Sequence, residues 1–408
     1  MQWAWAMAGS GPRRWSALDR CGGDPLAALA VADQDVRQRR SLRLGPGDRR
    51  RQARQMLKQL QADLDQGWAV AGFWGYELGA ALEGLEAEPG GPADAEWICF
   101  NPEALQRVTL PEVHAPPRDL AAVPPEDLLR QRNGFVASAR EVLERIAAGE
   151  VYQVNLSAEV AVPISEWPAP LRALAAVQAV QPVPFAAVFR GQSHLLISGS
   201  MERFLAVRGA QVSSRPIKGT APRRTDPLQD AAEARSLRAS AKECAENTMI
   251  VDMVRNDLQR AARRGSVRVT DLLATEPYAT LWHLESEIAA SLTRPRRLDA
   301  LLEATMPAAS VTGCPKIQAM RVIAQLERRR RGPYCGAVGL ALPGGPVDLA
   351  VAIRTLWLDE HQARFAVGAG LVADSVPEAE WLETCLKARS PLAILASIQE
   401  PRAIPEGP

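Results

Sequence analysis

The sequence of 408 residues lacks several features that mark whole classes of protein. No apolar run reaches the roughly 18 residues of a membrane-spanning helix, so we predict no membrane partner. The charges almost cancel, to a net +1, which leaves neither a basic field for nucleic acid nor an acidic tail. Residues 1–10 are mildly apolar but have neither a basic start nor a long apolar stretch, so we expect no signal peptide.

Paired cysteines are also missing. None of the cysteines forms a CxxC pair or has the spacing of a zinc site. Scattered cysteines in a chain of this length are typical of reduced, mostly buried thiols, so we expect a cytoplasmic protein. The six are Cys21, Cys99, Cys244, Cys314, Cys335 and Cys385.

The composition is that of a globular protein, with 47% hydrophobic and 23% charged residues and no repeat of short period. Prolines cluster between Thr109 and Glu126, and proline restricts the backbone and removes a donor, so we predict an irregular connection there. It divides an N-terminal part, residues 1–125, from a C-terminal part, residues 126–397, which a tail at 398–408 follows. The prolines are Pro111, Pro116, Pro117, Pro124 and Pro125.

The C-terminal part alternates helical and strand patterns. Apolar residues recur at helical spacing over 133–148, and 232–262 has the pattern of one long helix or two joined helices. Residues 185–189 and 194–198 are typical of paired strands. This mixture predicts an α+β or layered α/β fold, with the strand order left open. Residues 68–79 are typical of a buried strand followed by a tight turn. Further strands are expected at 151–162, 334–342, 347–356 and 365–372, with a last helix at 376–397.

Lys218 stands between Ile217 and Gly219 in a segment bracketed by Pro216 and Pro222. Glycine lets the backbone approach a ligand closely, and burial disfavours the charged form of lysine, which can then act as a nucleophile. The local sequence alone favours the plainer alternative, a surface lysine in a loop.

Glu246 continues a helical stripe made by Ile250, Val254 and Leu258. An unpaired carboxylate on a buried stripe is costly, so Glu246 needs a cation, and a divalent metal is one solution. A pair with Lys242, one turn earlier, is the other. The residues leave both open.

The last helix places Glu380, Glu383 and Lys387 on one face. Its start is marked by Ser375 and Glu378, which have the spacing of a capping box. An exposed charged face with a Glu383–Lys387 pair is the plainer interpretation. The preceding segment 368–370 contains two glycines, which suit anion contacts by backbone N–H groups, although this signal is weak.

Two other polar residues stand in apolar surroundings. Arg354 is the single arginine of the strand expected at 347–356, where a carboxylate ligand or a structural ion pair would satisfy it. His283 suits a ligand contact or a satisfied place in the core equally well.

Together these segments resemble the chorismate-utilising enzymes, the family of anthranilate, aminodeoxychorismate, isochorismate and salicylate synthases. The resemblance is strong over residues 130–395 and looser through Phe73–Glu77. It implies a large sandwich of antiparallel sheets and helices in one structural unit. The matching motifs stand in the family's order: 149–157 (GEVYQVNLS), 202–205 (ERFL), 216–220 (PIKGT), 245–247 (AEN) with 255–257 (RND), 311–316 (VTGCPK), 331–336 (RGPYCG), 353–355 (IRT) and 368–370 (GAG) through Glu383–Thr384.

Two positions separate the reactions within the family. The members that add water resemble one another in carrying a lysine base where this chain has Gln153. Anthranilate synthases typically have alanine where this chain has Lys218. The resemblance therefore implies the aminodeoxychorismate synthase branch, with an anthranilate synthase and a non-catalytic regulatory relative as the alternatives.

The family's site residues carry over by motif. The resemblance implies that Lys218 attacks C2 of chorismate while Glu202 protonates the leaving 4-hydroxyl, and that ammonia then adds at C4. Glu246 and Glu383 match the ligands of a Mg²⁺ ion, supported by Glu243 and Glu380. The residues implied to bind the substrate are Thr220, His283, Gly313, Tyr334, Arg354, Gly370 and Lys387.

The chain carries no glutaminase cysteine motif, so we expect ammonia from a separate glutamine amidotransferase subunit. Lys218 can attack only as a neutral amine. We expect its apolar neighbours to lower its pKa by desolvation and Arg215 and Arg223 to lower it by like charge.

Overall fold

The computed structural model describes residues 3–6, 27–86, 88, 91–116, 124–278 and 281–399. Within them, all strands belong to two antiparallel sheets. The expectations for the chain's first residues, for Pro117 and for most of the tail at 398–408 lie outside the described residues. Of the helices in these ranges, none combines the length and apolar composition needed to cross a membrane.

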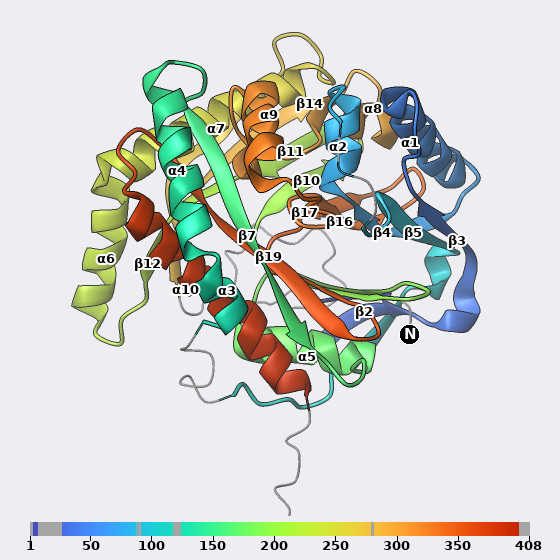
Figure 1. The fold of residues 1–408 in the computed structure, drawn as a ribbon. Helices are drawn as coiled ribbons and strands as arrows, with labels where there is room; N and C mark the ends of the chain where they lie inside the picture. Colours follow the sequence, from blue (N-terminus) through green and yellow to red (C-terminus); the bar gives the residue numbers. More distant parts are fainter. Residues whose placement is uncertain are drawn as a thin grey trace, which may run out of the picture.

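The nine-stranded sheet has the order β15-β7-β19-β18-β9-β8-β1-β2-β6. Its longest strands, β7 and β19, pair along their whole length, so that Gly370 lies opposite Asn155 (Figure 1). The strands span Gly313–Cys314 (β15), Gln153–Pro163 (β7), Gln362–Leu371 (β19), Thr355–Leu358 (β18), Leu195–Ser200 (β9), Phe185–Arg190 (β8), Trp3–Ala6 (β1), Ala27–Val31 (β2) and Gln106–Thr109 (β6).

The ten-stranded sheet has the order β12-β14-β11-β10-β17-β16-β4-β5-β3, with β13 (Arg268–Pro277) also pairing with β14. Both sheets take strands from either side of the proline-rich connection. The strands span Ile217–Pro222 (β12), Leu281–Ser291 (β14), Gln211–Arg215 (β11), Arg203–Arg208 (β10), Val347–Val351 (β17), Ala337–Ala341 (β16), Ala69–Trp74 (β4), Ala95–Phe100 (β5) and Val36–Leu42 (β3).

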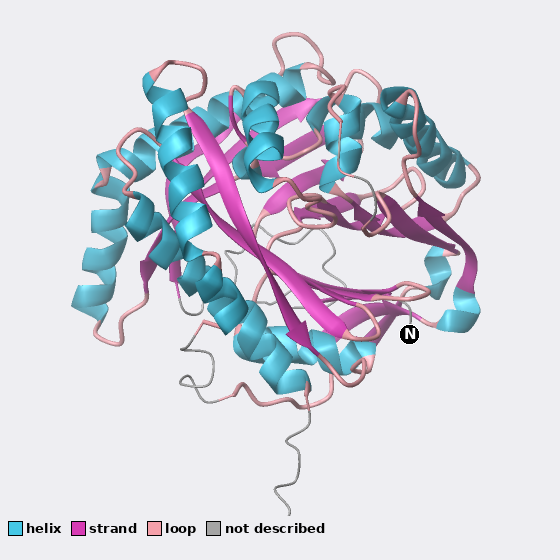
Figure 2. Ribbon diagram, viewed as in Figure 1, coloured by secondary structure: helices cyan, strands magenta, loops and turns pink. Residues whose placement is uncertain are grey.

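Helices cover the outer faces of both sheets (Figure 2). The nine-stranded sheet packs against α3 (Glu126–Arg130), α4 (Arg132–Ala147), α5 (Pro170–Val180), α9 (Lys316–Glu327) and α10 (Pro377–Ile398). The ten-stranded sheet packs against α1 (Arg49–Asp65), α6 (Pro227–Ala239) and α7 (Ala241–Gln259), with α2 (Tyr76–Leu82) and α8 (Leu298–Thr305) beside α1.

Strand β8 shows why this layering suits the sequence. Its apolar run is buried on both faces: Phe185 and Phe189 belong to the core between the sheets, while Ala186 and Val188 pack with helix α5. A strand that is buried on both faces has a continuous apolar sequence, without alternation of apolar and polar residues. The predicted mixed sandwich of antiparallel sheets and helices is confirmed.

The structure corrects three local predictions. Residues 347–356 do not form one strand, because β17 lies in one sheet and β18 in the other. Both sheets are buried, so the apolar sequence does not reveal the change of sheet. The capping box also does not form: helix α10 begins after Val376, and the Ser375 hydroxyl donates to Glu380 Oε1 at 2.6 Å.

The third correction concerns 68–79, where the buried strand forms as β4, but Tyr76–Leu82 is helix α2 and not a tight turn. The other element predictions hold closely. The 232–262 pattern resolves into α6 and α7, two helices that meet at Ser240. The Ser240 side chain accepts a hydrogen bond from the backbone N–H of Glu243 and so caps α7.

Candidate active site

At two of the points where the chain passes from one sheet to the other, a predicted site residue lies at the crossing. Glu202 follows β9 and precedes β10, while Arg354 lies between β17 and β18. Backbone bonds join the two crossings: Val351 N donates to Glu202 O, and Gly199 N donates to Arg354 O, both at 3.0 Å. Arg354 has φ of +51°, a conformation that costs energy for a residue with a side chain.

Lys218 lies in a break of the β12–β14 pairing. Ile217 pairs with Glu285 and Thr220 with His283, and the register shifts between them. Gly219 has φ of +88°, which glycine adopts without strain. Such bulges re-aim side chains. Gly370 lies in β19 of the nine-stranded sheet, and a Cβ placed on it would lie 3.4 Å from Lys218 Nζ. The Lys218 amine therefore reaches the other sheet.

Burial is the main reason that the pKa of Lys218 is lowered, and the nearby Lys387 ammonium acts in the same direction. Glu246, Glu202 and Glu383 oppose this shift. The desolvation predicted from the sequence is therefore confirmed, but the predicted like charges are wrong. Arg215 pairs with Glu276 and Glu285, and Arg223 pairs with Asp230, so both guanidiniums are neutralised elsewhere.

Glu202 is buried, and burial raises its pKa to about 7. Hydrogen bonds from the Ser310 side chain and the Ile217 backbone act against that rise, as does the charge of Lys218. A carboxyl with this pKa holds its proton in a large share of molecules at neutral pH. It can therefore donate a proton, which is what a general acid requires.

The predicted metal ligands come from different helices but share lysine neighbours. Glu246 on α7 and Glu383 on α10 both interact electrostatically with Lys218 and Lys242. Burial raises the pKa of Glu246, and the carboxylates of Glu243 and Glu380 add to that rise. Of the two alternatives that the sequence left open for Glu246, the direct ion pair with Lys242 does not form; Lys242 Nζ lies 3.6 Å from Glu380 Oε1.

The second predicted ligand, Glu383, is half-exposed and forms an ion pair. Glu383 Oε1 lies 2.6 Å from Lys387 Nζ, and although burial acts to raise the pKa of Glu383, this ion pair holds it below its usual value. Within the described residues, no three His, Cys, Asp or Glu side chains are arranged to hold a metal ion together. The excess of carboxylates around Glu246 and their hard oxygen donors nevertheless fit Mg²⁺.

The predicted substrate-binding residues gather around the same place from both sheets. Arg354 Nη1 donates to Lys387 O at 2.6 Å, and Tyr334 and Glu383 also interact with it electrostatically. Burial lowers the pKa of Arg354 to about 10, so the guanidinium stays charged at neutral pH. It can pair with a carboxylate there.

His283 and Thr220 form a contact of their own, with His283 Nδ1 3.1 Å from Thr220 Oγ1. Burial lowers the pKa of His283 to about 4, so its ring is neutral, and its buried Nε2 has no hydrogen-bond partner within the described residues. A neutral imidazole with one unused nitrogen suits a polar group of a ligand.

Gly313 and Gly370 make room for Gln153. A Cβ on Gly313 would lie 2.2 Å from Gln153 O, and one on Gly370 would lie 2.7 Å from Gln153 Nε2. A side chain at Gly313 would collide with the backbone of Gln153, whereas one at Gly370 would displace the Gln153 amide and crowd the Lys218 amine. The amide of Gln153, buried and unable to act as a base, therefore lies beside the Lys218 amine.

Residues 29–393 match the family of chorismate binding enzymes. The chain belongs to this family. It is 42% identical over 255 residues to aminodeoxychorismate synthase component 1 of Escherichia coli (strain K12), covering 62% of this chain and 55% of that protein. It is also 38% identical over 372 residues to anthranilate synthase component 1 of Streptomyces coelicolor, covering 79% of this chain and 72% of that protein.

The chain spans about half the length of the first aminodeoxychorismate synthases that it matches, with 55%, 42% and 54% of them covered. Its fold is similar to that of anthranilate synthase component I from Streptococcus pneumoniae. The TM-score is 0.72 at 23% identity, with 90% of this chain and 92% of that chain covered. This likeness confirms the sandwich that the family resemblance implied.

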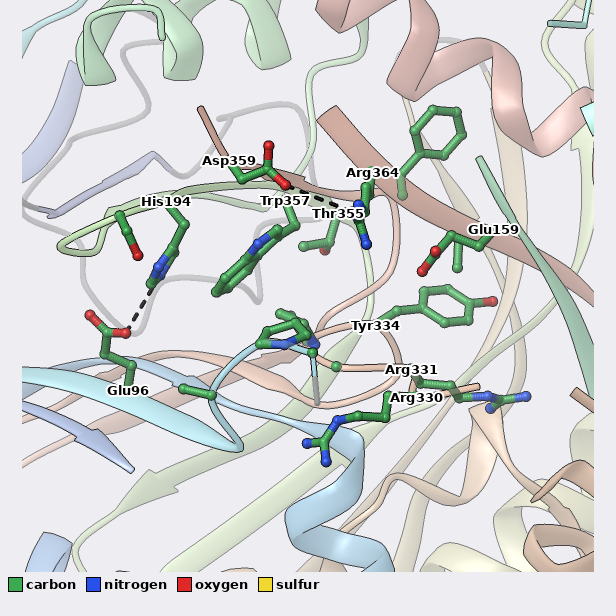
Figure 3. A pocket seen from close by; sticks show the side chains of 18 of the residues that line it. Glu96, Glu159, His194, Arg330, Arg331, Tyr334, Thr355, Trp357, Asp359 and Arg364 are labelled. Carbon is green, nitrogen blue, oxygen red and sulfur yellow. Dashed lines mark ion pairs between the residues drawn. The ribbon is translucent and has the colours of Figure 1, made fainter. Parts of the chain in front are cut away.

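A separate cavity of about 490 Å³ lies behind Tyr334, and neither Lys218 nor Glu202 lines it (Figure 3). His194 stacks on Trp357 in this cavity, with ring centroids 3.8 Å apart. Two close pairs are drawn in it: His194 Nε2 lies 3.6 Å from Glu96 Oε2, and Arg364 Nη2 lies 3.9 Å from Asp359 Oδ2. Of the predicted site residues, only Tyr334 lines this cavity.

Sequence reasoning missed two polar neighbours of the site. The side chain of Ser310 hydrogen-bonds Glu202, and that of Asn155 hydrogen-bonds Tyr334. Both stand within or directly before motifs that carry the resemblance, at 149–157 and 311–316. That placement was the only signal, because a serine or asparagine there has no pattern of its own.

Proposed function

We propose that the chain converts chorismate and ammonia into 4-amino-4-deoxychorismate and water. The observation that carries this proposal is the position of Lys218: a buried amine with a lowered pKa, aimed by a bulge toward the other sheet and interacting electrostatically with Glu202, a carboxyl that can hold a proton. Supporting it is the similarity to proteins named aminodeoxychorismate synthase.

The chemistry divides between two residues. The neutral amine of Lys218 forms a bond to C2 of chorismate, both ring double bonds shift (to C1–C6 and C4–C5), and the C4–oxygen bond breaks. Glu202 gives its proton to the departing hydroxyl, which leaves as water. Ammonia then forms a bond to C4, both double bonds return to their original positions, and the C2–nitrogen bond to Lys218 breaks. The proton that ammonia loses restores Glu202.

The other residues bind and orient the substrate. Arg354 and Lys387 carry the positive charge for its carboxylates, and Tyr334 borders the guanidinium of Arg354. We propose that Glu246 and Glu383 hold Mg²⁺ with support from Glu243 and Glu380; a bound Mg²⁺ would supply a fixed positive charge for a substrate carboxylate.

We further propose that a glutamine amidotransferase subunit supplies the ammonia. The relatives named component 1 imply a second component. A cytoplasmic location suits this chemistry, and the five cysteines within the described residues are free thiols.

A second function deserves testing because the anthranilate synthase of Streptomyces coelicolor matches over more of its length than the first aminodeoxychorismate synthases do. The deciding experiment is incubation with chorismate, Mg²⁺ and an ammonium salt, with product identification by mass and absorbance. The 4-amino product, with pyruvate retained, supports the proposal. Anthranilate with released pyruvate would contradict it.

A further inference from the structure

Lys316, the first residue of α9, lies in a buried polar cluster away from Lys218. Its Nζ donates to Asp257 Oδ2 at 2.5 Å, to Pro307 O at 2.9 Å and to Thr305 O at 3.2 Å. An ammonium group has three N–H donors, so every donor of Lys316 has an acceptor. The side chains of Lys316 and Asp257 are 10% and 9% exposed, so water competes little for these bonds.

These bonds fix the backbone that leaves α8. Thr305 is the last residue of that helix, and Pro307 follows two residues later. The next turn is closed from within, since the Thr312 hydroxyl donates to Ala308 O and Ala309 O at 3.2 and 3.1 Å. The segment 306–312 is therefore anchored at its start by Lys316 and braced at its end by Thr312.

The same segment carries Ser310, whose side chain hydrogen-bonds Glu202. Glu202, Ser310 and Asp257 also line one small cavity of about 10 Å³. Asp257 belongs to α7, the helix that carries Glu246. One ammonium group thus ties the backbone before Ser310 to the helix of a proposed metal ligand.

We propose that Lys316 is a positioning residue for the general acid: it holds the 306–312 segment so that Ser310 meets Glu202. Losing this anchor weakens the Ser310 hydrogen bond, which stabilises the carboxylate form, so the pKa of Glu202 rises further. The other titratable or charged groups that face Glu202 are Lys218, Arg203 and the carboxyl groups of Glu285 and Asp257. The proposal rests on the general-acid role of Glu202 in the proposed function.

The test is Lys316→Met, with Lys316→Met/Asp257→Asn as the variant that leaves no buried charge unpaired. Chorismate consumption is followed, because it does not depend on which amine forms. We expect kcat to fall by about 10- to 100-fold with a much smaller change in KM. The alkaline limb of the kcat–pH profile should move to higher pH, because Glu202 keeps its proton longer. Adding Ser310→Ala to either variant should lower kcat little further, because the changes at Lys316 and Ser310 remove the same Ser310–Glu202 interaction.

Arg40→Met is the matched control. Arg40 lies in β3, at the opposite edge of the ten-stranded sheet from β12. Its guanidinium donates a hydrogen bond of 3.0 Å to the fully buried Asp63. It should lower the melting temperature and leave the pH profile in place. If the Lys316 variants also lose only melting temperature, or if KM rises at unchanged kcat, Lys316 is structural and the proposal is wrong.

A readout without turnover separates this proposal from the proposed function. The pH at which Glu202 ionises also appears in the stability difference between the wild type and Glu202→Gln. That pH should rise in the Lys316→Met/Asp257→Asn background, even if the wild type makes a different product. An unchanged pH would overturn the proposal on its own.

Discussion

Glu202→Gln should stabilise the folded chain above neutral pH while it removes activity. The pKa of Glu202 rises from 4.5 to about 7 on folding, because burial disfavours the carboxylate. Between these values the unfolded chain releases the proton and the folded chain keeps it, so stability falls as the pH rises. Below pH 4.5 Glu202 costs nothing, and above about pH 7 the full cost is present.

The size of the effect follows from the same two values. A rise from 4.5 to about 7 corresponds to about 3 kcal/mol of lost stability. Glutamine keeps the shape of the side chain without the charge, so it should recover most of this amount. In a chain of this length, about 3 kcal/mol corresponds to a rise in melting temperature of about 3–4 °C.

The assay compares the melting temperatures of the wild type and Glu202→Gln at pH 5 and pH 8. All other titrating groups are common to both chains, so the difference isolates Glu202. We expect little difference at pH 5 and the larger gain at pH 8, together with a loss of turnover of about 100- to 10,000-fold. A gain that is the same at both pH values, or no gain, would show that Glu202 is ionised in the fold at neutral pH.

Three further predictions concern the metal, the nitrogen source and the bulge. EDTA should abolish turnover and added Mg²⁺ restore it, and Glu383→Gln should be folded but inactive; full activity in EDTA would refute the metal assignment. The purified chain should use ammonium at raised pH but not glutamine until an amidotransferase partner is added, and glutamine use by the chain alone would rule out the need for that partner. Gly219→Ala should lose most activity by displacing Lys218, because Gly219 has φ of +88° and the new Cβ would lie 2.9 Å from Glu243 Oε2 and 3.1 Å from Leu237 Cδ1. A wild-type kcat in this variant would show that the bulge does not aim the lysine.

The sequence revealed the residues of the site better than it revealed their arrangement. The stripe of Glu246, Ile250, Val254 and Leu258 is buried as predicted, because helical periodicity is a local property. The change of sheet at Arg354 was hidden, because both strands beside it are buried and apolar. The sequence correctly predicted that the pKa of Lys218 is lowered. Burial was the right reason, and the like charges of Arg215 and Arg223 were the wrong one. Which charges surround a group depends on contacts such as Arg215–Glu285, which join distant parts of the chain.

Ser310 and Lys316 show the same limit. Their side chains act through residues that are 108 and 59 positions away, Glu202 and Asp257. Nothing in the neighbouring residues indicates such partners. Sequence motifs could mark the segment as important, but only the fold shows which bond each side chain makes.

The most direct test of the central claim is mass spectrometry of the wild-type chain quenched with chorismate and Mg²⁺ in the absence of ammonia. The account predicts an adduct on the peptide that carries Lys218, with the mass of chorismate less one water, and none in Lys218→Ala. It also predicts that Lys218→Ala, supplied with ammonium, loses most of the 4-amino product. No adduct on that peptide, together with formation of 4-amino-4-deoxychorismate by Lys218→Ala at the wild-type rate, would contradict the account, because Lys218 would then not be the nucleophile.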